Sequence, residues 1–378
     1  MKRNNIIGLL ATVLLLSASC TNHHVTIDTT INEDGSCIRE YTISVKIAGG
    51  QTMDGENMTT DYRKFNKFED FTDQTMAFDD SWQKSWSHLN NTARHAFPAD
   101  ASSANDTLLA HATRHFVSVD EMNSNIPLLW NGKPYSVKGE LKKTFKWFYT
   151  EYTYVETYAS VASEFSVPCK DYVDEETMRY WFTGKPDMLA GMAGYEASEK
   201  MNDLSNRMEE WGMANLIYDW CDIVAENYDS LQNAPLTKQE FLNKRPELVK
   251  FAKQESYGMT IGGKSWEDMM NEFFKSDVYG KMFAEGTPYS NRLGDLITEK
   301  YGADANYDYR LRMPGTIMST SSGVFDYGVA VFRISPQYMF VGDYVITATS
   351  QVTNYWAYII SILVIALAVG SFIYNKKR

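Results

Sequence analysis

The chain has 378 residues, of which 44% are hydrophobic and 14% aromatic, and its formal net charge is −12. This length allows a large core and two subdomains, and the ordinary apolar content excludes bulk disorder. Five positive charges lie at the two ends, so removing them from the total of −12 leaves −17 for the part between them. A body this acidic excludes nucleic acid as a partner, because Lys and Arg are needed to neutralise phosphate backbones.

Residues 1–19 have the pattern of a lipoprotein signal peptide. Two basic residues are followed by the apolar run Ile6–Leu16, which is too short to span a bilayer, and then by the small residues Ser17–Ser19. Cys20 comes next, as in a bacterial lipobox, and this order predicts that Cys20 carries a lipid anchor such as palmitate. The alternative is ordinary cleavage after the small residues, which leaves Cys20 as a plain thiol.

The first part of the body, residues 20–173, is predicted to be β-rich with short helices. Val25–Ile47 is expected to form a hairpin whose turn, Asn32–Ser36, contains an Asp-Gly pair. From Thr52 to Leu89, Phe, Met and Trp recur every three to four residues, which predicts amphipathic helices. Leu108–Val119 alternates in polarity and is expected to be a strand.

Two histidine pairs are candidates for metal sites. His23 and His24 are adjacent on an extended chain, so their side chains cannot readily share one ion. His111 and His115 have the spacing of a helical pair, but the motif lacks the glutamate of HExxH. A strand would separate them by about 13 Å. We therefore expect no metal site and no cofactor.

Val137–Ala162 has alternating aromatic residues and is predicted to form strands. It also carries the only dense basic patch of the acidic body, made of Lys138, Lys142, Lys143 and Lys146. One interpretation is a site for an anionic headgroup or ligand. The other is an edge strand that lysines protect from pairing with another chain.

Residues 174–302 are predicted to be a large helical insertion, with the longest helix at about Asn202–Ser230. Gly258–Ser265 fits the nucleotide-binding pattern GxxxxGK[ST]. That loop normally follows a buried strand, whereas the segment before it here, Pro246–Glu255, has a helical pattern. We therefore interpret Ser265 as a helix N-cap and expect no nucleotide.

Three cysteines remain if Cys20 is lipidated. An odd number leaves one thiol unpaired in an oxidising compartment, and we expect a disulfide between Cys169 and Cys221, because Cys37 faces inward from a strand. The sequence has neither a GxSxG nor an SxxK motif and offers no Cys-His nucleophile. No catalytic residue is predicted.

Strands return in residues 303–353, at 316–319, 327–334 and 343–350, and they are followed at once by an apolar helix. Tyr355–Tyr374 has twenty uncharged residues, which rise about 30 Å as a helix, the thickness of the hydrocarbon core. Tyr and Trp lie at its start and the basic tail, residues 375–378, at its end. This pattern predicts a transmembrane helix with a cytoplasmic tail. The short connection from Ser350 places the β domain close to the lipid.

The two ends of the chain resemble the LppM-type bacterial lipoproteins. The matching pieces cover less than a third of the chain and are Asp34–Ser36, Met313–Ser319, Val329–Phe332 and Ala348–Ser350. Ser322-Gly323 stands where the family has Asn-Gly, Phe332 where it has Trp, and the helical middle has no counterpart. The resemblance implies a β-rich extracytoplasmic domain, able to bind lipid or glycolipid and tethered by a terminal helix. It implies no catalytic residues.

The predicted fold class is α+β. Strands from both ends form one antiparallel β domain that carries the helical insertion, and a single transmembrane helix follows. Our leading hypothesis is a non-enzymatic envelope lipoprotein, held at the outer face of the bacterial cytoplasmic membrane by Cys20 and the terminal helix, which binds a lipid-like ligand or a partner protein. The alternatives are a structural subunit of a membrane complex and an envelope enzyme with an acidic site.

Overall fold

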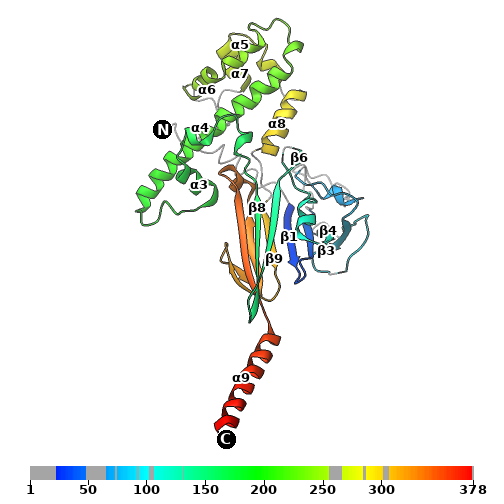
Figure 1. The fold of residues 1–378 in the computed structure, drawn as a ribbon. Helices are drawn as coiled ribbons and strands as arrows, with labels where there is room; N and C mark the ends of the chain where they lie inside the picture. Colours follow the sequence, from blue (N-terminus) through cyan, green and yellow to red (C-terminus); the bar gives the residue numbers. More distant parts are fainter. Residues whose placement is uncertain are drawn as a thin grey trace.

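The computed structural model describes residues 23–47, 65–72, 75–91, 93–101, 106–130, 132–254, 266–283, 287–300 and 306–376. The predicted signal peptide, Cys20 and the segment Gly258–Ser265 lie outside these residues. The chain has three parts along one axis: a helical part at one end, β-sheets in the middle and a single helix at the other end (Figure 1).

The larger sheet joins strands from both ends of the chain. β1 (His23–Ile31) pairs antiparallel with β2 (Cys37–Lys46) on one side and parallel with β9 (Tyr307–Arg312) on the other. The sheet has seven strands in the order β11-β12-β9-β1-β2-β4-β3, where β11 is Phe325–Asp326, β12 Val329–Ile334, β4 Thr107–Phe116 and β3 Gln83–His88. Inward residues of β2 alternate with half-exposed ones, as the sequence pattern predicts.

The second sheet has four antiparallel strands in the order β10-β13-β8-β7, which are β10 (Thr316–Thr320), β13 (Tyr344–Thr353), β8 (Tyr149–Tyr158) and β7 (Val137–Phe145). Buried residues of both sheets belong to one hydrophobic core, which includes Tyr41, Tyr154 and Tyr309. Two short strands, β5 (Leu129–Trp130) and β6 (Lys133–Pro134), form a separate pair. The short helix α2 (Val119–Asn123) contacts β7 through Asn123, which binds the backbone of Gly139.

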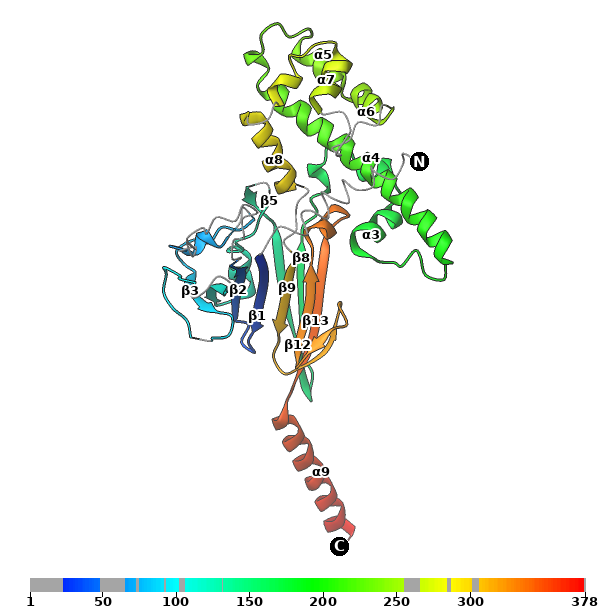
Figure 2. The ribbon, with the colours of Figure 1, turned by 180° about the vertical axis from the view of Figure 1, so that it is seen from behind.

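Helix α4 (Gly194–Glu226) is the axis of the helical part (Figure 2). Its Met208 and Trp211 pack in the same core as the strands, and Asn215 hydrogen-bonds both the N–H and the carbonyl of Val167. Beyond that point Trp220 belongs to a second core, formed with α5 (Lys238–Asn243), α6 (Arg245–Gln254) and α7 (Trp266–Phe274). Helix α3 (Glu175–Thr183) precedes α4, and α8 (Pro288–Lys300) is joined to it by a buried pair in which Lys300 Nζ lies 2.7 Å from Asp219 Oδ1.

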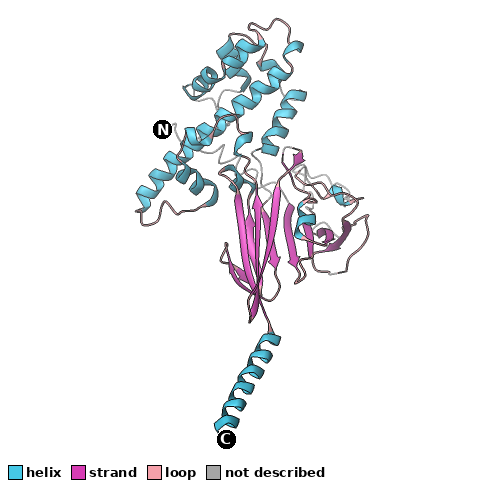
Figure 3. Ribbon diagram, viewed as in Figure 1, coloured by secondary structure: helices cyan, strands magenta, loops and turns pink. Residues whose placement is uncertain are grey.

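Helix α9 (Tyr355–Lys376) leaves the end of the sheets opposite the helical part (Figure 3). It follows β13 after the single residue Asn354, and Ala357 is its one buried residue. Among the described residues it is the one helix long and apolar enough to cross a membrane. Its exposure distinguishes it from the core helix of a soluble protein.

The expected α+β class is confirmed, and the strands are mostly antiparallel, with β1 and β9 as a parallel pair. The strands expected in Leu108–Val119, in Val137–Ala162 and at 316–319, 327–334 and 343–350 are present as β4, as β7 and β8, and as β10, β12 and β13. The amphipathic helices expected within Thr52–Leu89 are wrong for the described residues, where a short 3₁₀ turn at Phe68–Asp70 is followed by β3. Aromatic residues at this spacing are buried individually from an irregular segment. Phe68 makes an edge-to-face pair with Phe78, and Phe71 makes one with Phe97.

The disulfide expected between Cys169 and Cys221 is also wrong, because both residues are free cysteines. Cys169 packs in the core of the sheets, with its sulfur 3.9 Å from Met208 Sδ, whereas Cys221 belongs to the helical core. The inward position expected for Cys37 is confirmed, since 1% of this residue is exposed.

Candidate functional site

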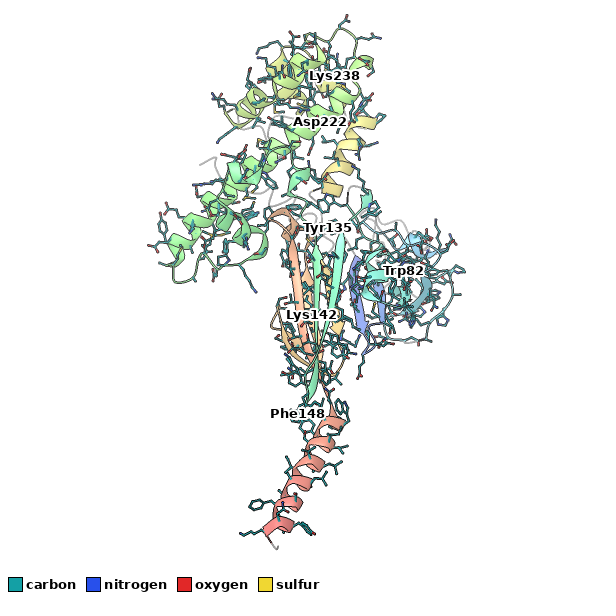
Figure 4. All side chains as sticks on the ribbon, viewed as in Figure 1. Trp82, Tyr135, Lys142, Phe148, Asp222 and Lys238 are labelled. Carbon is teal, nitrogen blue, oxygen red and sulfur yellow. The ribbon has the colours of Figure 1, made fainter. Side chains whose placement is uncertain are left out.

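Three groups of side chains are candidate functional sites: a buried charge cluster between the sheets, a Ser-His-Glu group on the larger sheet, and an aromatic junction between a hairpin tip and α9. The single site residue predicted from the sequence, Cys20, lies outside the described residues, so its lipidation stays a prediction. Figure 4 shows the described side chains on the ribbon.

The buried charge cluster joins the two sheets through Arg39 of β2 and Glu156 of β8. Arg39 Nη2 donates to Glu156 Oε2 over 2.6 Å, and each side chain is 1% exposed. Arg39 Nε also donates to Thr29 Oγ1 at 2.9 Å. Glu156 accepts three tyrosine hydroxyls, from Tyr154 at 2.5 Å, Tyr158 at 2.9 Å and Tyr309 at 2.7 Å. Both charged groups are therefore hydrogen-bonded at several atoms, which buried ions require.

The electrostatics of this cluster keep it ionised. Burial acts to raise the pKa of Glu156, but the charge of Arg39 and the hydrogen bonds from Arg39, Tyr154 and Tyr309 outweigh it and hold the pKa below its usual value. Burial and the neighbouring carboxylate raise the pKa of the Tyr154 and Tyr158 hydroxyls, which stay neutral donors. The cluster is closed to solvent and has the chemistry of a clamp between sheets.

The sequence contained a usable signal for this cluster. In β2 the inward positions alternate, so the pattern that places Cys37 and Tyr41 in the core places Arg39 there as well. In β8 the same alternation places Glu156 between Tyr154 and Tyr158. A charge at an inward position of each sheet indicates a buried pair, which sequence reasoning missed because it assessed each strand alone.

A Ser-His-Glu group lies on three neighbouring strands of the larger sheet. Ser87 Oγ of β3 is 3.0 Å from His111 Nε2 of β4. On the other side of the ring, His111 Nδ1 is 3.2 Å from Thr42 Oγ1 and 3.4 Å from Glu40 Oε1 of β2. A nucleophile, a base and an orienting carboxylate in this order are the parts of a hydrolase triad.

The surroundings of this group restrict what it can do. Ser87 is 3% exposed and His111 5%. Burial raises the pKa of Glu40, but hydrogen bonds from His111, Arg94 and Thr113 more than compensate and hold it far below its usual value. Arg94 Nη2 donates to Glu40 Oε1 at 2.8 Å, so the carboxylate is shared between a surface arginine and the histidine. A substrate needs access to Ser87 that the described residues do not give it.

The aromatic junction links the turn of the β7–β8 hairpin to the first two turns of α9. Phe148 lies beside the start of α9 in Figure 4, and its ring centroid is 4.7 Å from that of Tyr358. Trp147 packs on Trp356 with centroids 5.3 Å apart, and its Nε1 donates to Ser361 Oγ at 3.0 Å. The junction therefore extends from the sheet onto the helix.

Asn354, the residue between β13 and α9, holds the hairpin turn at this junction. Its Nδ2 donates to the carbonyl of Lys146 at 2.8 Å, and its backbone N–H donates to the carbonyl of Phe148 at 2.9 Å. Its Oδ1 accepts the Thr150 hydroxyl at 3.1 Å. One buried amide side chain thus fixes the hairpin turn and the start of the helix together.

The lysines of the predicted basic patch are dispersed along the edge strand β7 and its turn. Lys138 pairs with Glu140 at 2.6 Å, and Lys143 Nζ donates to the carbonyl of Glu33 at 2.9 Å. Lys142 lies above the junction in Figure 4. This arrangement agrees with a lysine-protected edge strand and does not gather the four ammonium groups around one ligand.

A small pocket of about 240 Å³ lies between α3 and the first half of α4. Apolar side chains such as Tyr180, Met201 and Leu204 share its lining with the charged residues Lys200 and Arg207. Pockets for drug-sized ligands span about 300–1,000 Å³, so this one suits a fragment of a ligand and not a whole lipid.

In the described part of the chain, no group of three or more His, Cys, Asp or Glu side chains is placed so that it could hold a metal ion. His24 Nε2 lies 2.8 Å from Asp308 Oδ2, and His111 is engaged as described above. His115 is exposed.

No protein-family model, curated protein or solved structure matches this chain.

Proposed function

We propose that this protein is a non-catalytic binding module of the bacterial envelope, anchored at the outer face of the cytoplasmic membrane. In this proposal Cys20 is lipidated and α9 spans the bilayer, with the basic tail in the cytoplasm. The β domain, built from both ends of the chain, holds residues 174–302 as a helical insertion, and the LppM-type resemblance suggests a lipid-like molecule as the ligand. A partner protein is the other possibility.

The observation that carries this proposal is the exposure of α9. Its apolar side chains are exposed in the described part of the chain, among them Ile362, Leu363 and Leu367. An apolar helix of this length that leaves the body after one residue fits a bilayer and not a protein core. The helical part lies at the far end of the molecule, where a single span would hold it away from the lipid (Figure 1).

A topology experiment on the full chain tests the anchor. We expect the protein to stay in the membrane after alkaline carbonate extraction. External protease added to spheroplasts should digest the body and spare a fragment with α9. Replacing Val364, in the middle of α9, by Lys should remove the protected α9 fragment while the Cys20 lipid still holds the body at the membrane, because a charge at the helix centre costs about 2.5–3.5 kcal/mol on insertion scales. Tyr195→Lys, at an exposed residue of α4, is the matched control. Release of the unchanged chain by carbonate would contradict the proposal.

Mass spectrometry of the purified full chain in nanodiscs distinguishes the two classes of ligand. A lipid-binding module should retain one lipid species in a fixed ratio after exchange into a different lipid. A protein-binding module should retain no such lipid and should instead recover one partner in a fixed ratio. If the intact chain retains neither a lipid nor a partner protein in a fixed ratio, the binding-module proposal is overturned.

The second candidate function is an envelope hydrolase, and the 3.0 Å separation of Ser87 Oγ and His111 Nε2 favours it. A fluorophosphonate probe, which reacts with activated serines, decides between the two. The binding-module proposal predicts no labelling of Ser87, because this side chain is closed to solvent. The hydrolase would be established instead if the probe labels the protein, if Ser87→Ala abolishes the labelling, and if Ser85→Ala on the same strand leaves it intact.

A further inference from the structure

We infer that the tip of the β7–β8 hairpin, residues 145–148, enters the outer lipid layer beside α9. The partner of this surface is a phospholipid bilayer, in the zone where headgroups meet acyl chains. The inference rests on the proposed span of α9 and goes beyond it, because a span alone requires only that the helix contacts lipid.

The depth of the tip follows from one hydrogen bond. Trp147 Nε1 donates to Ser361 Oγ at 3.0 Å. Ser361 lies six residues past Tyr355, and six helical residues rise about 9 Å. The uncharged run from Tyr355 to Tyr374 matches the hydrocarbon core at about 30 Å, so little of it can lie in water. When α9 spans, the Trp147 indole therefore lies on the bilayer side of Tyr355.

The chemistry of the tip suits that depth. Phe145, Trp147 and Phe148 are between 41% and 59% exposed, although they pack on α9. Trp and other aromatic rings concentrate at membrane interfaces, where an apolar body and a polar edge are both satisfied. Lys146, the remaining residue of the tip, has a long side chain that can extend its ammonium group to the phosphates. Three exposed aromatics next to a lysine are typical of an interfacial anchor.

The tip cannot swing away from the bilayer without breaking its attachment to α9. Asn354 holds the carbonyls of Lys146 and Phe148, and the ring of Phe145 stacks on Trp356 with centroids 6.2 Å apart. The hairpin is continuous with β8, whose register with β13 runs over ten residue pairs. The β domain is therefore attached to the membrane at two points, α9 and the tip, which together fix its tilt.

A photoactivatable phospholipid with a diazirine on its acyl chain tests this inference in nanodiscs that contain the full chain. We expect cross-links in α9. We also expect them in the proteolytic peptide Trp147–Lys170, at Trp147 or Phe148. Val345 itself, located by fragmentation of the peptide that it shares with α9, is the internal control. Val345 is exposed but lies eight residues before Thr353, which is about 27 Å along the strand. It should show no cross-link.

Variants separate this inference from the proposed span. Trp147→Glu should abolish cross-linking at Phe148 and leave the cross-links of α9 intact, whereas Tyr195→Glu on α4 should change neither. Cross-links in α9 without any in residues 145–148 of the unchanged chain would overturn the inference alone. Absence of cross-links from α9 as well would overturn the proposed span, so the two failures are distinguishable.

Discussion

Arg39 and Glu156 form an ion pair of 2.6 Å that joins the two sheets, and each side chain is 1% exposed. The pair connects β2, near the start of the chain, to β8, which pairs with the last strand β13. Three tyrosines complete the hydrogen bonding of the carboxylate. Because each ion depends on the other to offset its desolvation, the pair makes the two sheets interdependent.

Removing one partner of this pair is expected to destabilise the whole β domain. Arg39→Met leaves the Glu156 carboxylate buried without its counter-ion, and such changes cost about 3–5 kcal/mol. We expect a large drop in the thermal unfolding midpoint of the full chain in nanodiscs. Adding Glu156→Leu to this variant should recover part of the loss. The exposed pair of Lys138 and Glu140 supplies the control, and Lys138→Ala should leave the midpoint unchanged. Equal midpoints for Arg39→Met and Lys138→Ala would contradict the clamp.

Acid is expected to reduce the stability that the Arg39–Glu156 pair contributes to the folded protein. The pKa of Glu156 is lower in the folded protein than its ordinary value of 4.5, so the folded state binds fewer protons at this site. Its contribution is present above the ordinary pKa and is lost as the pH falls toward the folded pKa. We predict that the thermal unfolding midpoint decreases as the pH is lowered below 4.5. The double variant Arg39→Met/Glu156→Leu should show a smaller decrease over the same pH range.

Glu209 provides a control because its pKa is shifted in the opposite direction to that of Glu156. Burial raises the pKa of this residue, so its ionised form destabilises the folded state at neutral pH, and protonation removes that penalty as the pH falls. Glu209→Gln should therefore raise the unfolding midpoint at pH 7 and have a smaller effect at pH 4. A midpoint that is insensitive to pH in all of these variants would rule out the electrostatic account.

Gly315 is predicted to be intolerant of substitution because the chain passes close to another strand there. It has φ +71°, and a Cβ atom would lie 2.1 Å from the carbonyl oxygen of Gln351 on β13. Gly323 has a similar φ of +68° but open space around it. Both Ala variants incur about 1–2 kcal/mol of left-handed strain, and Gly315→Ala should lose about 1–3 kcal/mol more from overpacking. Thermal midpoints compare the two, and equal losses would contradict the close approach.

The three cysteines of the body are predicted to resist alkylation in the folded protein. Burial raises the pKa of Cys37 to about 11 and of Cys169 and Cys221 to about 12, so little thiolate forms at neutral pH. Maleimide should label none of them in the native full chain and all three after denaturation without reductant. A native mass that shows a Cys169–Cys221 disulfide would contradict the structure.

Strands could be predicted where polarity alternates, as in β1, β2, β8 and β13, because each faces the core on one side only. The segment Phe65–Trp82 could not be predicted correctly, because its aromatic spacing imitates a helix while the residues fill an irregular, aromatic-rich part of the core. The parallel pairing of β1 with β9 also required the structure, since it joins residues about 280 positions apart.

The candidate sites depended on register, which a single strand does not reveal. Ser87, His111 and Glu40 come together because β2, β4 and β3 are neighbours in one sheet, and shifting either pairing by one residue would separate them. The contact of Trp147 with α9 could not be predicted either. The aromatic residues at the start of α9 were visible in the sequence, but their contact with a hairpin more than 200 residues earlier was not.

The direct passage from β13 into α9 has a mechanical consequence. If α9 spans the membrane as proposed, a force between the membrane and the body acts along β13, which pairs with β8 over ten residue pairs. Hydrogen bonds of an antiparallel pair lie perpendicular to the strands, so tension loads them in shear and all at once, not one after another as in unzipping. Asn354 couples the same load to the hairpin turn. With the proposed span in place, β13 would therefore transmit tension to the body without peeling the sheet.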